Sequence, residues 1–201
     1  MTVSIGQNPD SGFDEPLQLL SDCHRRIEKF LDILIRVVKD CPGQKLSAEY
    51  RTALTAALKY FRNAAPWHTR DEEDSLFPRM RQLEDQRVVD AMTQIDQLED
   101  DHVHAEKLHA QVETHGQRWL SHDHLPEADV KQLGQLLSEL REKYRRHIRE
   151  EDDVIFPLAG QVLNDQQLQE IGIEMAQRRG IDPANYQPRC KHAKANQTQN
   201  Q

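Results

Sequence analysis

The chain has 201 residues, of which 37% are hydrophobic and 30% are charged, enough for one core-bearing domain with appendages but not for two full-sized domains. Its net charge of −8 excludes a global positive field that would hold a nucleic-acid backbone or an anionic membrane surface. No run approaches the roughly 18 apolar residues of a membrane span, and the first residues lack the apolar stretch of a signal peptide, so we expect neither role.

Composition also bears on fold class and location. Glycine and aromatic residues are scarce, while Leu, Ala, Gln, Glu, Arg and Asp are common, which favours helices over sheets. The three cysteines are odd in number and outside CxxC spacing, so we expect a cytoplasmic protein without a disulfide framework. The unusual feature is the presence of ten histidines.

Apolar periodicity and turn residues predict the elements in chain order. Helices are expected over about 14–39, 47–78, 87–120 and 127–158, followed by a shorter amphipathic helix over 165–179. Pro66 should kink the second helix, and Pro78 should mark its last turn. This gives a flexible N-terminus (1–13), a helical domain (14–160), a C-terminal helix (161–180) and a disordered tail (181–201).

Each of the four long helices carries polar residues inside its apolar stripe. The first and third helices place His24 and His102 there, and the fourth continues past its polar residues to Val154 and Leu158. Helix and connection lengths put these polar positions at similar heights in an all-α, up-down-up-down four-helix bundle. The side chains expected in one buried layer are His24, His68, Glu72, His102, His147 and Glu151.

The polar positions belong to a repeated pattern, H-x3-E-[DE]-D-x2-F-P. It begins at His68 and again at His147, an offset of 79 residues (147 − 68). The first and third helices share the pattern D-x-H-x3-E-K around His24 and His102, at an offset of 78 (102 − 24). Two such similar offsets indicate a duplicated helix pair with an approximate two-fold axis through a shared site.

A His and a Glu four residues apart lie one helical turn apart on the same face, so both can bind one ion. Four imidazoles and two carboxylates suit two metal ions, with Glu72 and Glu151 able to bridge them. Imidazole combined with carboxylate favours iron, with manganese or zinc open, and the lack of a thiolate pair argues against structural zinc. Left without a metal, these groups would be buried without partners at roughly 1–3 kcal/mol each.

This arrangement resembles the hemerythrin-like, or HHE cation-binding, family of single-domain bacterial proteins. The resemblance covers about residues 15–160 and implies two iron ions, completed by an oxo or hydroxo bridge or water, in a four-helix bundle. It implies as iron ligands His24, His68, Glu72, His102, His147 and Glu151. The sequence departs from the oxygen carriers of the family at Glu106, where they have a second histidine, which weakens the case for reversible oxygen transport.

Several neighbouring residues have two readings. Glu28 and Glu106 are more compatible with the flank of the site than with metal ligation, and Glu106 is the better candidate for a further ligand. Tyr144 fits either a core tyrosine or a hydrogen-bond partner of a bound ligand. The acidic residues of the repeated motif are either a solvated face or hydrogen-bond partners of the ligand histidines: Glu73, Asp74, Asp152 and Asp153.

We therefore expect a non-haem di-iron protein that binds or reduces a small oxidant, namely O2, H2O2 or NO, as in responses to oxidative stress. Whether it is an enzyme stays open at this point, with Glu106 favouring peroxide or nitric oxide handling over transport. The alternative is a non-catalytic iron- or oxygen-responsive binding module that acts through a partner protein. Neither nucleic acid nor membrane is expected as a partner, and the electron donor is not identified.

Overall fold

The computed structural model describes residues 11–182, and within them it holds helices and no strands. Residues 1–10 and 183–201, which include most of the predicted flexible N-terminus and tail, lie outside the described residues. The elements are α1 (Pro16–Asp40), α2 (Ala48–Asn63), α3 (Ala65–Asp71), η1 (Glu72–Leu76), α4 (Phe77–Arg81), α5 (Gln86–His122), α6 (Glu127–Glu150), η2 (Glu151–Ile155), α7 (Phe156–Val162) and α8 (Asp165–Arg178).

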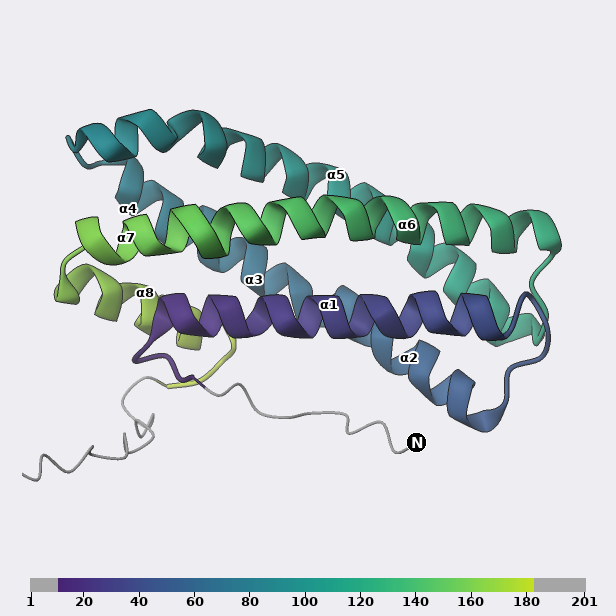
Figure 1. The fold of residues 1–201 in the computed structure, drawn as a ribbon. Helices are drawn as coiled ribbons and strands as arrows, with labels where there is room; N and C mark the ends of the chain where they lie inside the picture. The colour runs from purple at the N-terminus through teal and green to yellow at the C-terminus, as the bar shows by residue number, and fades with distance from the viewer. Residues whose placement is uncertain (1–10, 183–201) are drawn as a thin grey trace, which may run out of the picture.

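These elements form the predicted four-helix bundle (Figure 1). Its four rods are α1, the broken rod α2 to α4, α5, and the rod α6 to α7. Successive rods run antiparallel; α1 packs against α2 and α6, and α5 packs against the same two helices. The extra helix α8 packs against α1 and α3 at one end of the bundle. Among the described helices, none is both long and apolar enough to cross a bilayer.

The ends of the helices follow from local chemistry. The Ser47 hydroxyl caps α2 by accepting from the Tyr50 amide, and Asn164 forms a capping box with Gln167 at the start of α8. The predicted kink at Pro66 coincides with a one-residue interruption at Ala64, between the end of α2 at Asn63 and the start of α3, which has this proline in its first turn; Ala64 itself keeps a helical conformation.

Both copies of the repeated motif contain a π-helical turn that the sequence analysis did not predict. In η1 the Phe77 amide donates to the Glu72 carbonyl, five residues back. Pro78 has no N–H to continue an α-helical ladder, and a wider turn accommodates its ring. Pro78 lies in the last turn of the rod, as predicted, in the short helix α4, which ends at Arg81.

The second π turn corrects the predicted stripe of the fourth rod. The extra residue in η2 rotates the following side chains around the axis, so that Ile155 is buried and Val154 is 40% exposed. Leu158 is half-buried and packs at the edge of the apolar core.

The apolar core is divided into two clusters. One contains Ile27, Phe61 and Ala105, and the other contains Leu20 and Leu98. On α1 and α5 the residues of the two clusters flank His24 and His102 respectively. The polar layer thus lies between two apolar cores, remote from both ends of the bundle.

Candidate metal centre

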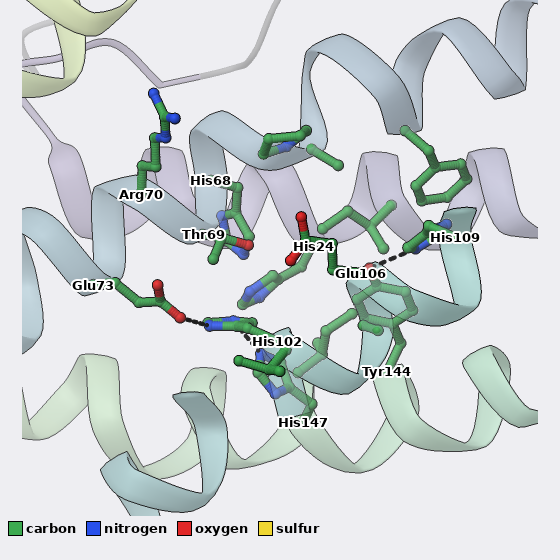
Figure 2. A pocket seen from close by; sticks show the side chains of 17 residues that line it. His24, His68, Thr69, Arg70, Glu73, His102, Glu106, His109, Tyr144 and His147 are labelled. Carbon is green, nitrogen blue, oxygen red and sulfur yellow. Dashed lines mark hydrogen bonds and ion pairs between the residues drawn. The ribbon is translucent and has the colours of Figure 1, made fainter. Parts of the chain in front are cut away.

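Six polar side chains meet in this layer, and none is more than 9% exposed. They come from all four rods, and Figure 2 shows the four imidazoles turned toward one another. The groups of donor atoms within 4.8 Å of one another are His24 with His68, Glu72 and Glu151, and His102 with His147 and Glu151. The structure therefore brings together all six residues that the sequence analysis singled out.

The repeated motif also fixes how two of the rings are oriented. His24 donates from Nδ1 to Asp152 Oδ1 at 3.0 Å, and His102 donates from Nδ1 to Glu73 Oε1 at 2.9 Å. Glu73 and Asp152 are equivalent in the duplication, so each motif orients the histidine of the other half. An imidazole that donates from Nδ1 presents the lone pair of Nε2, here toward the centre of the layer.

Each glutamate reaches both groups of histidines. Glu72 has Oε1 3.2 Å from His68 Nε2 and Oε2 3.4 Å from His102 Nε2. Glu151 has Oε2 3.0 Å from His24 Nε2 and Oε1 3.2 Å from His147 Nε2. Donor atoms bound to one first-row cation at about 2.1 Å are about 3.0–3.4 Å apart, which matches these separations.

Five of the buried donor atoms lack hydrogen bonds of their own. All four carboxylate oxygens of Glu72 and Glu151, together with His24 Nε2, are buried without a hydrogen-bond partner. Where a lone pair of His24 faces a carboxylate oxygen at 3.0 Å, the two repel unless a proton or a cation lies between them. The donor set therefore fits a cation, with neutral imidazoles and ionised carboxylates as its ligands.

Without a cation, protons bound to the histidines and glutamates reduce the repulsion between these donor atoms. Burial lowers the pKa of His24, but the carboxylates of Asp152 and Glu151 outweigh it and raise that pKa to about 10. The same balance raises the pKa of His102 to about 10. His68 has no such orienting carboxylate, and burial together with the charge of His24 holds its pKa well below the usual value.

The two glutamates titrate in opposite directions. Burial and the neighbouring Glu151 raise the pKa of Glu72 to about 7. Burial also opposes ionisation of Glu151, but the charged His147 and His24 hold its pKa well below the usual range. Without a cation, the layer thus keeps one carboxylate ionised and holds a proton on or near the other.

A cavity of about 300 Å³ adjoins the cluster. Its inner wall includes the four imidazoles, together with Tyr144 and His109, whose Oη and Nε2 are 2.8 Å apart in a hydrogen bond (Figure 2). Its outer lining includes the exposed residues Arg70, Val103 and Glu106 between α3 and α5. The cavity thus connects the polar layer with solvent.

The remaining candidates lie outside the donor groups. Glu106 is exposed and lines the cavity, and Glu28 is exposed on α1. The third acidic residues of the motifs, Asp74 and Asp153, are exposed and do not contact the histidines, unlike Glu73 and Asp152. Of the histidines outside the layer and the cavity, His104, His122 and His124 are exposed, His115 is half-buried, and His192 lies outside the described residues.

Sequence reasoning missed one contributor, Asp101. Asp101 Oδ2 lies 3.8 Å from His147 Nδ1, behind the ring, and also pairs with Lys143. The duplication hides this residue, because its equivalent in the first half is Cys23. His109, seven residues after His102 on α5, allows two interpretations from the sequence, a structural residue or the lining of an access path; it lines the cavity and bonds to Tyr144 there.

Comparison with known proteins agrees with the bundle and its buried layer. The chain is similar to an uncharacterized protein of Haemophilus influenzae, with 26% identity over 180 residues that cover 84% of this chain and 92% of that protein. A family model described as the hemerythrin HHE cation binding domain matches residues 15–159, a range that includes every donor of the cluster. With a matching fold and a His and Glu layer suited to a cation, this chain belongs to the hemerythrin HHE cation-binding family.

Proposed function

We propose that this chain is a non-haem di-iron protein that binds or reduces a small oxidant: O2, H2O2 or NO. The observation that carries the proposal is that each of the two glutamates turns one oxygen toward each histidine group. One cation would be held by His24 and His68, the other by His102 and His147, and both by Glu72 and Glu151. A single cation would leave one pair of buried imidazoles without a ligand role.

The donor chemistry favours iron among the available cations. Imidazole and carboxylate together suit iron, and the cluster contains no thiolate. Bound iron supplies one-electron chemistry and coordination positions that a small ligand can occupy. Cys23 and Cys41 are free thiols in the described part of the chain, which supports a reducing, cytoplasmic location.

The protein contributes access and hydrogen bonding to this chemistry. The cavity is at the low end of the volumes found for ligand pockets, which suits small molecules. Tyr144 lies on its wall with the ring 6.5 Å from that of His147, so its hydroxyl can hydrogen-bond a ligand that enters from solvent. We assign Glu106 to the cavity lining, where it keeps the entrance polar, and not to the ligand set.

The first experiment is iron loading. We expect two irons per chain and the absorption of a bridged diferric centre after oxidation. His68→Ala and His147→Ala should each lose at least one iron, whereas His122→Ala, which alters an exposed residue at the end of α5, should load like wild type. Equal loading of all three variants would refute the ligand assignment.

The second experiment identifies the reaction. Anaerobic ferrous protein is mixed in turn with O2, H2O2 and NO, and absorbance changes and turnovers are followed by stopped flow. A spectral change with one of them supports the proposal. A protein that loads two irons but responds to none would support the alternative, a non-catalytic iron-responsive binding module acting through a partner protein.

A further inference from the structure

The helix α8 packs more extensively against the first of the two repeated motifs. It packs against α3 and η1, the segments that carry His68 and Glu72, and it also contacts α1 (Figure 1). Its inward face is apolar, with Ile171 and Met175 fully buried. Beside this face, charged side chains at the C-terminal end of α8 hydrogen-bond to the segment between His68 and Glu72.

Asp71 is the centre of these polar contacts. It immediately precedes Glu72, and its carboxylate is completely buried. Arg178 donates from Nη1 to its Oδ1 at 2.9 Å, and Arg179 donates from Nη2 to its Oδ2 at 2.6 Å. A buried carboxylate bound by two guanidinium groups is held in one place, since moving it would leave a charge without a partner.

The π turn that follows is attached to α8 as well. Ser75 donates its hydroxyl hydrogen to the Glu174 carboxylate and accepts from Arg178 Nη2 at 2.5 Å. Arg79, one turn further on, donates from Nη2 to Glu174 Oε1 at 2.8 Å. The backbone of Glu72 is therefore fixed to α8 on both sides, at positions 71 and 75.

The second motif has no equivalent of this attachment. The duplication places Glu150 and Val154 where the first motif has Asp71 and Ser75. Val154 cannot hydrogen-bond through its side chain and is 40% exposed, and within residues 11–182 no side chain of α8 bonds to η2. The pseudo-symmetric site is thus held unequally.

The chain segment before α1 holds α8 in place. Ser11 donates its amide to Asp22 Oδ2 at 2.9 Å, and the backbone at Phe13 crosses α8 at Gly172. A Cβ atom at position 172 would lie 1.9 Å from the Phe13 carbonyl oxygen, far inside van der Waals contact. Only glycine permits this crossing, so α8 can be displaced by a substitution that alters no charge.

We propose that α8 is a clamp that holds the first motif in ligand geometry, with Asp71 as its positioning residue. Docking of α8 raises the cation affinity of the half-site of His24 and His68, and a cation there in turn stabilises docked α8, because coupling between two binding events is reciprocal. The half-site of His102 and His147 depends on α8 less, because its histidines lie on α5 and α6 and only Glu72 and Glu73 of the first motif reach it. This inference rests on the proposed two-cation site.

The test uses two backgrounds that isolate the half-sites. His147→Ala leaves the first half intact, and His68→Ala leaves the second. In each background Gly172→Ala is introduced and Co2+ is titrated as a redox-stable probe, followed by its absorption. We expect Gly172→Ala to weaken Co2+ binding about 10–100-fold in the His147→Ala background, the usual effect of losing support behind a ligand. In the His68→Ala background the weakening should be clearly smaller, because that half-site takes only Glu72 from the first motif.

Control variants separate the clamp from general destabilisation. Gly160→Ala puts a Cβ at an ordinary 3.5 Å from a Leu17 methyl carbon and should change neither affinity. Asp71→Asn should reproduce the selective loss if Gly172→Ala does not fold. Limited trypsin digestion is a measurement that does not depend on a metal-binding constant. Co2+ should slow cleavage after Arg178 in wild type but not in Gly172→Ala.

Three results would overturn the clamp: equal weakening in both backgrounds, no weakening in either, or cation-independent cleavage after Arg178 in wild type. Failure of the underlying site has a different signature, since wild type itself would then bind fewer than two Co2+ ions per chain. That result would remove the two-cation site and the clamp with it.

Discussion

Replacing Glu72 by Met should stabilise the metal-free protein while abolishing its capacity for a full complement of metal. Glu72 is completely buried, and neither of its oxygens has a hydrogen-bond partner. Met has a similar length, no charge and no acceptor to desolvate, so it removes the cost of the carboxylate while filling the same space. The buried carboxylate that the binding site needs therefore lowers the free energy of unfolding of the metal-free protein.

The size of the effect follows from the pKa of Glu72. A rise from 4.5 to about 7 means that ionising this group costs about 3 kcal/mol more in the folded than in the unfolded state. Because the folded pKa is raised, the folded state binds the proton more tightly, and stability falls as pH rises from about 4.5 to 7. The full cost is present above pH 7 and vanishes below pH 4.5.

Chemical and thermal denaturation in the presence of a chelator, at pH 5 and pH 8, measures this. At pH 8 Glu72→Met should exceed wild type by about 3 kcal/mol, or about 6–12 °C in Tm for a chain of this size, and at pH 5 by much less. Glu106→Met, at an exposed position, should stay within about 0.5 kcal/mol at both pH values. A Glu72→Met apoprotein less stable than wild type at pH 8 would refute the reasoning.

Three further outcomes are expected. Gly116→Ala should lower the free energy of unfolding by about 1–2 kcal/mol, because its Cβ would lie 2.6 Å from a buried leucine methyl, whereas Gly134→Ala, with 3.9 Å of clearance, should raise it by about 0.5–1 kcal/mol in thermal melts. Asp152→Ala should weaken Co2+ binding about 10–100-fold and Asp153→Ala should not, as titration would show. Burial lowers the pKa of His109 to about 4, so protonation of the unfolded chain reduces stability as pH falls from 6.5 to 4, and this acid loss should be shallower in His109→Gln denaturation curves.

The features that the sequence predicted correctly are those that depend on the spacing of residues along each helix. A period of 3.6 residues defined the four rods, and a break in each apolar stripe marked His24 and His102. The fold class is confirmed by the structure. The repeated offset added long-range information, because two copies of one helix pair must place equivalent residues at one level of a two-fold bundle. For this reason the layer of six side chains could be anticipated from a single sequence.

What the sequence did not predict depends on contacts between distant segments. Glu73 and Asp152 each bond a histidine of the opposite half, and no local rule states which acidic residue of a motif faces inward. The π turns had a signal in the repeated Phe-Pro pair, but the resulting outward rotation of Val154 needs the packed helix to be seen.

Duplication also conceals whatever differs between the copies. A repeat-based interpretation assigns the same role to equivalent positions, yet Asp71 is bound by the two arginines at the end of α8, Arg178 and the adjacent Arg179, while its counterpart Glu150 is not. Likewise, Asp101 lies behind a histidine where the other half has Cys23. These differences surround the two half-sites that we propose, each with two histidines. Because ligand type sets which cation binds and the surrounding contacts set how tightly, similar donors in unequal surroundings should bind their cations in sequence, not together.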